Sequence, residues 1–499
     1  MANVITLTAH DGSQVEFVDT IIGQGGMKDV YFSPDKSYVV CFFRTKADAA
    51  TRDRLLTIAA TYRERIFNQA GGDFWQNLFC WPTKVVEHDG RLGIVTPTYQ
   101  PQFFFKVGSR NSDFLAIKGK EKEGKWFASA FHQSKNLDVQ EKGDFYKYLQ
   151  ICLNISRAVR RMHAAGLAHS DLSYKNVLID PTSGKAAIID IDGLVVPGKY
   201  PPDVIGTPDF IAPEVLATLS LDYHDKGRRF PNIATDRHAL AVMIYMYLLR
   251  RHPLRGRKVN DADPTRDEEL SMGANALFVE HPTDKSNRPN PADMKPSYLP
   301  WGDVTKVPYT VCGPYLTKLF DRAFTVGLKT PSERPTADDW ETALIKTVDL
   351  LQPCPNPACE QKWYVFDNTT VPKCPYCGTA YVGPLPMLNL YAKTPKGQFS
   401  FENHRLMVYS NQYLYRWHTL RNVVPNEKLK DIEKQPVGYF VFHQGRWVLV
   451  NQRMIGLRDI DQAKDIPVGQ MLELRDGQKI LLSNEDGGRL AIVQISNGN

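Results

Sequence analysis

Residues 169–176, His-Ser-Asp-Leu-Ser-Tyr-Lys-Asn, separate two segments of different periodicity. Before them, residues 146–163 carry apolar side chains three or four positions apart, which predicts an amphipathic helix. After them, residues 177–179 are Val-Leu-Ile, a short apolar run that predicts a strand. We therefore expect the stretch on a loop between two regular elements, with Asp171 and Asn176 five positions apart.

Residues 15–350 contain five further motifs, one before residues 169–176 and four after them. They are a glycine-rich turn at 23–26, an acidic run at 190–193, Gly-Thr-Pro-Asp-Phe-Ile-Ala-Pro-Glu at 206–214, Asp236 at the start of an apolar helix, and Arg334. Together with residues 169–176 they resemble the eukaryotic-like protein kinase superfamily. The resemblance implies an α+β, bilobal protein-kinase-like fold that binds ATP with Mg²⁺ or Mn²⁺.

The resemblance also implies roles for individual residues. Asp171 would orient the substrate hydroxyl, and Asn176 would bind a metal ion on the phosphates. A further metal ligand is expected after the apolar run 186–189, where the spacing favours Asp190 and the adjoining glycine favours Asp192. We favour Asp190 and keep Asp192 as a second ligand, because Mg²⁺ prefers carboxylate oxygens.

Three other positions of the loop differ from the common kinase pattern. Ser170 stands where many kinases have an arginine that pairs with an activation-loop phosphate, which argues against regulation by that route. Ser173 replaces the common catalytic-loop lysine. Lys175, two positions later, is either a cation for the γ-phosphate or a solvated loop lysine.

The glycine-rich turn departs from the family pattern as well. Three glycines are expected to let backbone N–H groups approach the phosphates, Gly23, Gly25 and Gly26. Lys28 replaces the last glycine of the usual motif, and the next strand has Cys41 where a lysine is expected. A similar exchange defines the with-no-lysine kinases. We therefore predict that Lys28 binds the phosphates, with Arg44 as the less favoured substitute.

Residues 46–69 have the periodicity of a helix. A kinase requires an acidic residue on this helix to pair with the phosphate-binding lysine, and we favour Glu64 over Asp53. The hinge between the lobes is expected near residues 97–101. Residues 107–140 are polar and rich in Lys and Glu, and we expect them to form a mobile insertion.

Small-molecule phosphotransferases share the catalytic loop but usually lack counterparts of the Ala-Pro-Glu segment, Asp236 and Arg334. The resemblance therefore implies a protein substrate, and an ion pair between Glu214 and Arg334. The insertion at 255–308 looks like that of bacterial kinases of the tellurite-resistance-associated group. That narrower resemblance implies a PP2C-like phosphatase and a von Willebrand A-type protein as partners.

Four of the eight cysteines lie close together, Cys354, Cys359, Cys374 and Cys377. Two cysteine pairs on tight turns can place four thiolates around one tetrahedral Zn²⁺. A redox dithiol is the alternative, but it does not require the second pair. We therefore predict a zinc ribbon at 352–384 with a structural Zn²⁺.

Residues 385–499 consist of short alternating apolar segments separated by Gly, Asn and Asp, which predicts an all-β sandwich domain. The order of residues 446–451 and 467–474 resembles the later half of a forkhead-associated domain, a reader of phosphothreonine. Arg416 and His418 only loosely match the earlier part of that family's pattern. A degenerate interaction or autoinhibitory module is therefore the favoured alternative.

The chain has 499 residues and a net charge of +6. We expect a kinase N-lobe at 1–100 and a C-lobe with insertions at 101–351, before the two smaller domains. The sequence lacks the concentrated basic patch that binding to nucleic acid usually requires, and it lacks an apolar run long enough to span a membrane. The absence of a signal sequence and the clustered cysteines favour the cytoplasm.

Two functions compete at this point. The first is an active serine/threonine protein kinase that uses Asp171, Asn176, Asp190 and Lys28. The second is a pseudokinase scaffold that binds nucleotide and partner proteins without phosphotransfer. The absent lysine at Cys41 favours the scaffold, and the intact acidic residues favour the enzyme.

Overall fold

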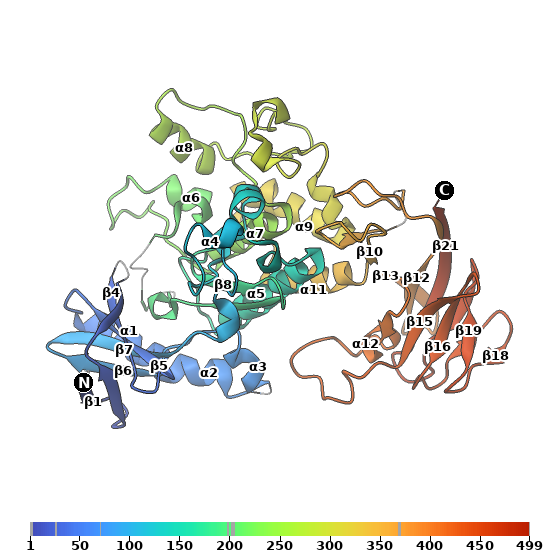
Figure 1. Ribbon diagram of the computed structural model, residues 1–499, viewed down its shortest axis with the longest axis horizontal. Coiled ribbons are helices and arrows are strands. Elements are labelled where there is room, and N and C mark those ends of the chain that lie inside the picture. Colours follow the sequence, from blue (N-terminus) through green and yellow to red (C-terminus); the bar gives the residue numbers. More distant parts are fainter. Residues whose placement is uncertain are drawn as a thin grey trace. The chain divides into compact units, whose positions relative to one another are not determined.

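The computed structural model describes residues 3–24, 27–69, 71–196, 199–200, 205–367 and 371–498. The chain divides into two compact units. The first contains Met1–Gly143, Gln150–Thr305 and Leu319–Glu341, and the second contains Asp144–Leu149, Lys306–Lys318 and Thr342–Asn499. Figure 1 labels the helices and strands of both. Each unit has its own sheets and its own hydrophobic core.

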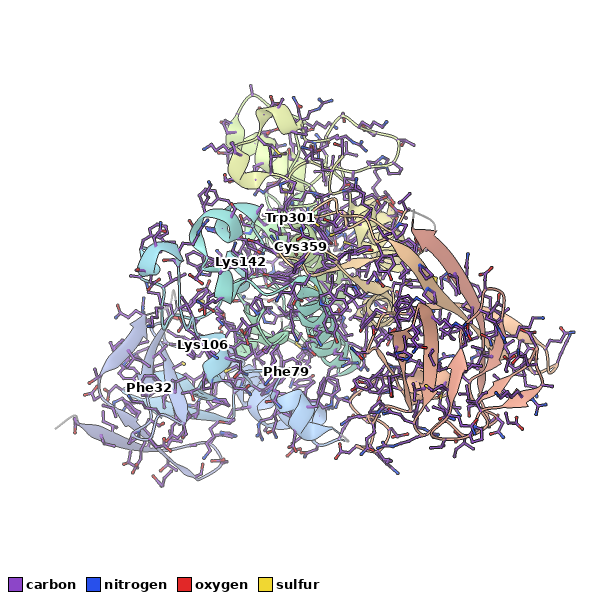
Figure 2. The ribbon with its side chains drawn as sticks, turned by 45° about the vertical axis from the view of Figure 1, so that its right-hand side comes forward. Phe32, Phe79, Lys106, Lys142, Trp301 and Cys359 are labelled. Atoms are coloured by element: carbon purple, nitrogen blue, oxygen red, sulfur yellow. The ribbon has the colours of Figure 1, made fainter. Side chains whose placement is uncertain are left out.

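The first unit begins with a five-stranded antiparallel sheet of order β3-β4-β5-β7-β6. Its strands are β3 (Ile21–Gln24), β4 (Lys28–Phe32), β5 (Tyr38–Phe43), β6 (Lys84–His88) and β7 (Arg91–Pro97). A hairpin of β1 (Val4–Thr8) and β2 (Gln14–Val18) precedes it and shares one core with it through Phe17, Val40 and Phe42. Figure 2 labels Phe32, the last residue of β4.

Residues 49–67 form the helical segment that follows the sheet's first three strands. It consists of α1 (Ala49–Thr57), one π-helical turn (Ile58–Tyr62) and α2 (Arg63–Phe67). Asp48 caps its start, since the carboxylate accepts the N–H of Thr51 at 2.7 Å. The predicted helix therefore exists, but the π turn adds a residue and changes which side chains face the sheet.

The rest of the first unit is mainly helical. The long helix α5 (Phe145–Ala164) leads into residues 169–176, and the hairpin of β8 (Val177–Asp180) and β9 (Lys185–Ile188) follows. These bounds confirm the helix and the strand predicted on either side of the loop. Helix α7 (Ile233–Leu249) is buried along most of its length, and Asp236 lies in its first turn.

The other α-helices of this part of the chain are shorter. They are α3 (Gly72–Gln76), α4 (Arg110–Asp113), α6 (Pro213–Leu216), α8 (Pro264–Met272), α9 (Pro314–Phe324), α10 (Val326–Lys329) and α11 (Ala337–Val348). Helices α5, α9 and α11 each contribute residues to both units. Within the described ranges, no helix has the length and apolar character that spanning a membrane requires.

Residues 107–140 pack into the first unit, which corrects the prediction of a mobile insertion. Phe127 and Leu137 are fully buried. Lys122 is buried too, and its ammonium forms ion pairs with Glu141 at 2.9 Å and Asp180 at 3.0 Å. A buried cation requires such partners because water no longer solvates it. Lys106 and Lys142, labelled in Figure 2, flank the segment.

The second unit contains a six-stranded sheet of order β13-β12-β21-β20-β17-β18 and a four-stranded sheet of order β14-β15-β16-β19. The longer strands are β12 (Gly383–Lys393), β13 (Phe399–Met407), β15 (Gly438–His443), β16 (Arg446–Asn451) and β21 (Arg489–Gly498). The shorter ones are β14 (Tyr413–Leu414), β17 (Arg458–Asp459), β18 (Lys464–Asp465), β19 (Met471–Glu473) and β20 (Lys479–Leu481).

Both sheets contribute to one core, which includes Leu388 and Val493 from the first sheet and Phe440 and Leu449 from the second. Alternation along each strand explains this, because every second side chain points to the same face. A small hairpin of β10 (Leu351–Pro353) and β11 (Trp363–Val365) precedes the sheets.

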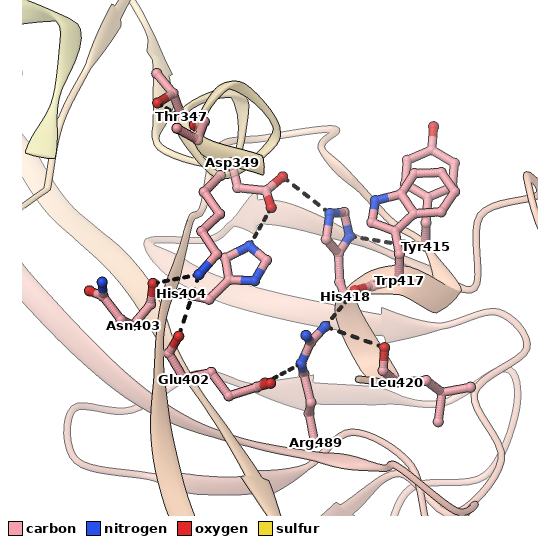
Figure 3. A network of polar contacts seen from close by, with 12 residues as sticks. Thr347, Asp349, Glu402, Asn403, His404, Tyr415, Trp417, His418, Leu420 and Arg489 are labelled. Carbon is pink, nitrogen blue, oxygen red and sulfur yellow. Dashed lines mark hydrogen bonds and ion pairs between the residues drawn. The ribbon is translucent and has the colours of Figure 1, made fainter. Parts of the chain in front are cut away.

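A buried carboxylate connects the end of α11 to the six-stranded sheet's edge strand. Asp349 accepts hydrogen bonds from Nε2 of His404 on β13 at 2.6 Å and from Nε2 of His418 on α12 (Arg416–Thr419) at 3.2 Å, as Figure 3 shows. Burial opposes ionisation of Asp349, but the two imidazoles outweigh it and hold its pKa well below the usual value.

We predict that Asp349→Ala lowers the free energy of unfolding by about 3 kcal/mol, because two buried imidazoles lose an ionised acceptor. Urea unfolding of the full chain, followed by tryptophan fluorescence, measures this change. Asp431→Ala is the control, since the Asp431 side chain is fully exposed. Equal stability of the two variants would contradict a structural role for the Asp349 contacts.

Candidate active site

Asp236 fixes the backbone of the loop 169–176. Its carboxylate accepts the N–H of His169 at 2.7 Å and the N–H of Ser170 at 3.3 Å, and His163 Nε2 lies 3.2 Å away. Ser170 has a positive φ of 67°, a conformation that non-glycine residues adopt only when their surroundings hold them there. Asp236 therefore anchors the backbone of the loop at His169 and Ser170.

Asp171 has hydrogen-bond donors at both carboxylate oxygens. Oδ2 accepts the side-chain amide of Asn176 at 2.9 Å, and Oδ1 accepts the N–H and the hydroxyl of Thr207 at 2.6 and 2.9 Å. The Thr207 hydroxyl also lies 3.2 Å from Ser173 Oγ. The structure thus brings the two predicted loop residues together and adds Thr207. The sequence feature that could have indicated Thr207 is its position after Gly206 in the motif that ends in Ala-Pro-Glu.

Lys28 lies between the two candidate metal-binding aspartates. Its ammonium is 2.9 Å from Asp190 Oδ1 and 2.8 Å from both carboxylate oxygens of Asp192. Burial works against the charged form of Lys28, but the charges of Asp192 and Asp190 outweigh it and raise the pKa of Lys28. The lysine of β4 and the acidic run 190–192 therefore form one charged cluster.

The two aspartates differ in exposure and backbone conformation. The side chain of Asp190 is 53% exposed, and that of Asp192 is 9% exposed. Asp190 takes the left-handed conformation, with φ 59° and ψ 45°, which is uncommon for a residue other than glycine. Its carboxylate is the more accessible to a ligand, whereas that of Asp192 is mostly enclosed by protein.

Cys41 lies on β5 opposite Val30 of β4, the neighbouring strand that begins with Lys28. Burial raises the pKa of the Cys41 thiol to about 11, so the side chain is neutral near pH 7. Arg44 forms an ion pair with Asp29 at 2.9 Å. Of the two candidate cations, Lys28 is therefore the one that lies at the acidic cluster.

The expected ion pair between Lys28 and Glu64 is absent from the described contacts, which corrects that prediction. Glu64 is exposed on α2, and the ion pairs of Lys28 are those with Asp190 and Asp192. The reason is helical geometry, because Glu64 lies two positions from both buried Tyr62 and buried Ile66. Residues two apart on a helix face different sides.

The other phosphate-site candidates are only partly described. Gly23 lies on β3 opposite Val30, and Gly25 and Gly26 fall outside the described residues. Lys175 is exposed, and its backbone N–H donates to Ser173 Oγ at 3.3 Å. The side chain of Lys175 is therefore open to solvent, on the same loop as Asp171.

Glu214 and Arg334 form the predicted ion pair. Two guanidinium nitrogens of Arg334 donate to the two carboxylate oxygens of Glu214 at 2.8 and 2.6 Å. Arg334 is fully buried and also donates to the carbonyls of Gly327 and Ala234. Loss of either partner leaves a buried charge unpaired, which is more costly than the pair itself is stabilising. This contact holds the Ala-Pro-Glu segment to the rest of the first unit.

The four clustered cysteines have the geometry of a metal site in the second unit. Cys354 Sγ lies 3.5 Å from Cys377 Sγ, and Cys359 Sγ lies 3.9 Å from Cys374 Sγ. All four sulfur atoms lie within 4.8 Å of one another. Tetrahedral zinc with bonds of about 2.3 Å requires sulfur separations of about 3.8 Å, so this donor set fits Zn²⁺.

Comparison with known proteins adds to this geometry. Residues 128–341 match the protein kinase domain family. The serine/threonine-protein kinase PknD of Chlamydia trachomatis serovar D is 26% identical over an alignment of 278 positions that covers 49% of this chain. The death-associated protein kinase dapk-1 of Caenorhabditis elegans is 34% identical over 139 residues, or 27% of this chain. A dual serine/threonine and tyrosine protein kinase of Gallus gallus is 36% identical over 68 residues, or 14%.

Each of these relatives is much longer than the region that it shares with this chain. The chain covers 26% of PknD, 8% of dapk-1 and 7% of the Gallus gallus kinase. Residues 128–341 of the chain are thus similar to a protein kinase domain. The family match includes Asp171, Asn176, Asp190 and Asp192, and it begins after Lys28.

We predict that the purified full chain contains one zinc ion, and that Cys374→Ser abolishes this binding. Structural zinc supplies roughly 10 kcal/mol of folding free energy in small zinc modules, so the variant should also unfold at lower temperature. Elemental analysis and differential scanning calorimetry measure the two effects. Cys41→Ser is the control and should keep its zinc. A metal-free wild-type chain would contradict the assignment.

Proposed function

We propose that the chain transfers the γ-phosphate of ATP to a serine or threonine hydroxyl of a protein substrate. Two contacts among three segments carry this proposal: Asn176 donates to Asp171 within the loop 169–176, and Lys28 of β4 pairs with Asp190 of the acidic run. The backbone N–H of Ile189, next to Asp190, donates to the carbonyl of Asn176 at 3.0 Å and so joins the loop to the acidic run. The match to the protein kinase domain and the similarity to PknD, a serine/threonine-protein kinase, support it. Magnesium ions, when bound with ATP, neutralise the phosphate charge that develops during transfer.

Asp171 is the residue that orients the acceptor hydroxyl in this proposal. A substrate hydroxyl would donate to its carboxylate, which holds the oxygen in line with the phosphate. Thr207 and Asn176 fix the position of that carboxylate, because both donate to it. Such fixed geometry lowers the barrier by removing the need to align the groups during the reaction.

Asn176 and Asp190 are the proposed metal ligands. Both offer oxygen atoms, which Mg²⁺ and Mn²⁺ accept. The greater exposure of Asp190 supports its choice over Asp192 as the principal ligand. Asp192 then serves mainly to hold Lys28, since both of its oxygens lie 2.8 Å from the ammonium.

Lys28 is the proposed phosphate-binding cation. Its raised pKa keeps the ammonium charged throughout the neutral range, so it can pair with a phosphate oxygen. Its contacts with Asp190 and Asp192 fix its place beside the expected metal site. Cys41 cannot replace it, because the thiol is neutral. Lys175, which is exposed, stays a candidate for a secondary contact with the γ-phosphate.

The C-terminal part is proposed to regulate or target the kinase domain. We infer a zinc ribbon at 352–384 and a β-sandwich of forkhead-associated type at 385–499. Arg416, a candidate for phosphothreonine, is already paired with Glu485 at 3.0 Å, which favours an interaction or autoinhibitory module over a phosphothreonine reader. A relation to the tellurite-resistance-associated group, with a PP2C-like phosphatase and a von Willebrand A-type protein as partners in the cytoplasm, stays a prediction.

A pseudokinase scaffold is the second candidate function. Two observations favour it, the neutral Cys41 in place of the usual lysine and the exposure of Glu64 away from Lys28. The two functions differ in one measurable property. A scaffold would give the same background of phosphate incorporation with and without the Asp171 carboxylate.

We predict that Lys28→Met lowers phosphate incorporation by about a hundredfold, the cost of losing one positioned charge from a transition state. The measurement is transfer of radiolabelled phosphate from ATP to a generic protein substrate and to the chain itself. The Asp171→Asn variant gives the background of phosphate incorporation without the Asp171 carboxylate. Cys41→Ala and Lys36→Met are the matched controls and should keep activity. Loss of activity in Cys41→Ala with retention in Lys28→Met would contradict the assignment.

We also predict different responses to Mg²⁺ in two aspartate variants. Asp190→Asn should raise the Mg²⁺ concentration for half-maximal activity by about tenfold, as expected for loss of a metal ligand. Asp192→Asn should mainly raise the KM for ATP, because Lys28 loses its bidentate partner. Titrations of Mg²⁺ at saturating ATP separate the two effects. The opposite pattern would make Asp192 the principal ligand.

A further inference from the structure

The outer face of the six-stranded sheet carries apolar side chains where a β-sandwich usually presents polar ones. Cross-strand register aligns four of them in one row, Phe401 of β13, Tyr391 of β12, Leu490 of β21 and Leu481 of β20. Their strand neighbours Ala491 and Ile480 point the opposite way, into the core that this sheet shares with the four-stranded sheet. The apolar row therefore lies on the face that the four-stranded sheet does not cover.

This apolar row is partly open to solvent. Phe401 is 41% exposed, and Phe399, two positions before it on β13, is 37% exposed. Tyr391, Leu481 and Leu490 are half-buried. The ring centroids of Tyr391 and Phe401 lie 5.5 Å apart, so each ring supports the other. Contiguous exposed apolar side chains mark interaction sites, whereas single ones are ordinary on a protein surface.

A groove of about 1060 Å³ covers part of this face, within the second unit. Leu481 and Leu490 of the apolar row line it, together with Phe399. Residues 393–395, from the turn between β12 and β13, and residues 483–488, from the turn between β20 and β21, also line it. The apolar side chains thus lie in a hollow with walls, which is a shape that a partner can enter.

Two lysines lie on opposite sides of the apolar row. Lys393 follows Tyr391 by two positions on β12, and Lys479 precedes Leu481 by two positions on β20, so both share the face of the row. Strands β12 and β20 run in the same direction, because both are antiparallel to β21. Both lysines are exposed and line the groove, and within the described part of the chain neither ammonium has an ion-pair partner.

The remaining charges of the groove leave it positive. The lining residues include three cations and two carboxylates, Lys393, Arg421, Lys479, Glu485 and Asp486. Arg421 lies 3.5 Å from Glu402, and Glu485 lies 3.0 Å from Arg416, so these two charges already have partners. The two lysines then face only Asp486, which is exposed. A ligand that brings carboxylates complements this groove, and a basic ligand does not.

We propose that the groove binds an acidic amphipathic helix of a partner protein. The apolar side chains of that helix would lie along the apolar row, and its carboxylates would pair with Lys393 and Lys479 on either side. Four adjacent strands about 4.8 Å apart span roughly 14 Å, which corresponds to about ten residues of helix. The inference concerns recruitment of a partner by the β-rich part and requires neither ATP nor phosphotransfer.

The direction of the apolar row favours a helix over an extended peptide. The row crosses the strands, whereas a peptide that adds as a strand pairs with the edge of a sheet. Arg416, which loosely matches the forkhead-associated pattern, is not among the described residues that line the groove. The proposed site is therefore separate from the position where that family's pattern would place a phosphothreonine.

A synthetic helical peptide tests this proposal. The probe is a fluorescein-labelled peptide of Leu and Glu, with Leu three and four positions apart so that one face is apolar. We expect it to bind the full chain in fluorescence anisotropy without nucleotide, and the same peptide with Lys in place of Glu to bind about tenfold more weakly. Added NaCl should weaken the binding, because the two lysines are exposed to solvent and salt screens them.

Reversal of charge tests the two lysines. Lys393→Glu and Lys479→Glu should each weaken binding of the Glu peptide by about fivefold, because each places like charges together. The double variant should prefer the Lys peptide to the Glu peptide. Lys464→Glu is the matched control, since Lys464 is exposed on β18 of the same sheet and lies outside the groove.

Removal of an aromatic ring tests the apolar part of the groove. Phe399→Ser should weaken binding of the Glu peptide by about tenfold, as expected for loss of an aromatic contact at an interface. Phe442→Ser is the matched control, because Phe442 is 43% exposed on β15 of the four-stranded sheet. Thermal melting followed by circular dichroism shows that each variant is folded before its Kd is compared.

Several results would overturn the proposal. They are absence of binding of the Glu peptide, or a Kd that stays the same in Phe399→Ser and in both lysine variants. A phosphothreonine peptide that binds only when Lys393 is present, while the Glu peptide does not bind, would make the groove a phosphopeptide site. Self-association in sedimentation that Phe399→Ser abolishes would make a second copy the occupant. Equal phosphate transfer by wild type and Asp171→Asn would contradict the kinase proposal alone, because peptide binding is measured without nucleotide.

Discussion

The ammonium of Lys28 lies between the carboxylates of Asp190 and Asp192, and the candidate site depends on that contact. The charges of Lys28 and Asp192 are mostly buried, so each requires a partner of opposite charge at hydrogen-bond distance. The contact joins β4 to the acidic run, which are more than 160 residues apart in the chain. The anchored loop at Asp236 and the buried Arg334 hold the surrounding backbone, so that the charges meet in one arrangement.

The sequence predicted those parts of the site that depend on the spacing of residues close together in the chain. The loop 169–176 lies between a helix and a strand as predicted, because periodicity and short apolar runs determine those elements. The four cysteines also meet as predicted, because each pair is close in the sequence and the four sulfur atoms lie within 4.8 Å of one another. Of the two candidate cations, Lys28 contacts the acidic run and Arg44 pairs with Asp29, and the role of Lys28 in phosphate binding stays a prediction.

The predictions that failed depended on contacts between distant residues. Glu64 has the right charge and lies on the expected helical segment, but it is two positions from buried Tyr62 and buried Ile66, so its side chain is exposed. Lys122 lies in a stretch whose composition suggests exposure, yet Glu141 and Asp180 enclose it. Composition averages over a segment and cannot show that one lysine in it has two buried carboxylates as partners.

The contacts of Asp349 bear on where this chain can be divided. Helix α11 has residues in both units, and the carboxylate just beyond it depends on imidazoles from β13 and α12. A fragment that stops between the cysteine cluster and the sheets would retain Asp349 without either imidazole. The last residues of α11 and the β-rich part therefore belong to one unit, which takes in the chain from Thr342, directly after the kinase-domain match ends at residue 341.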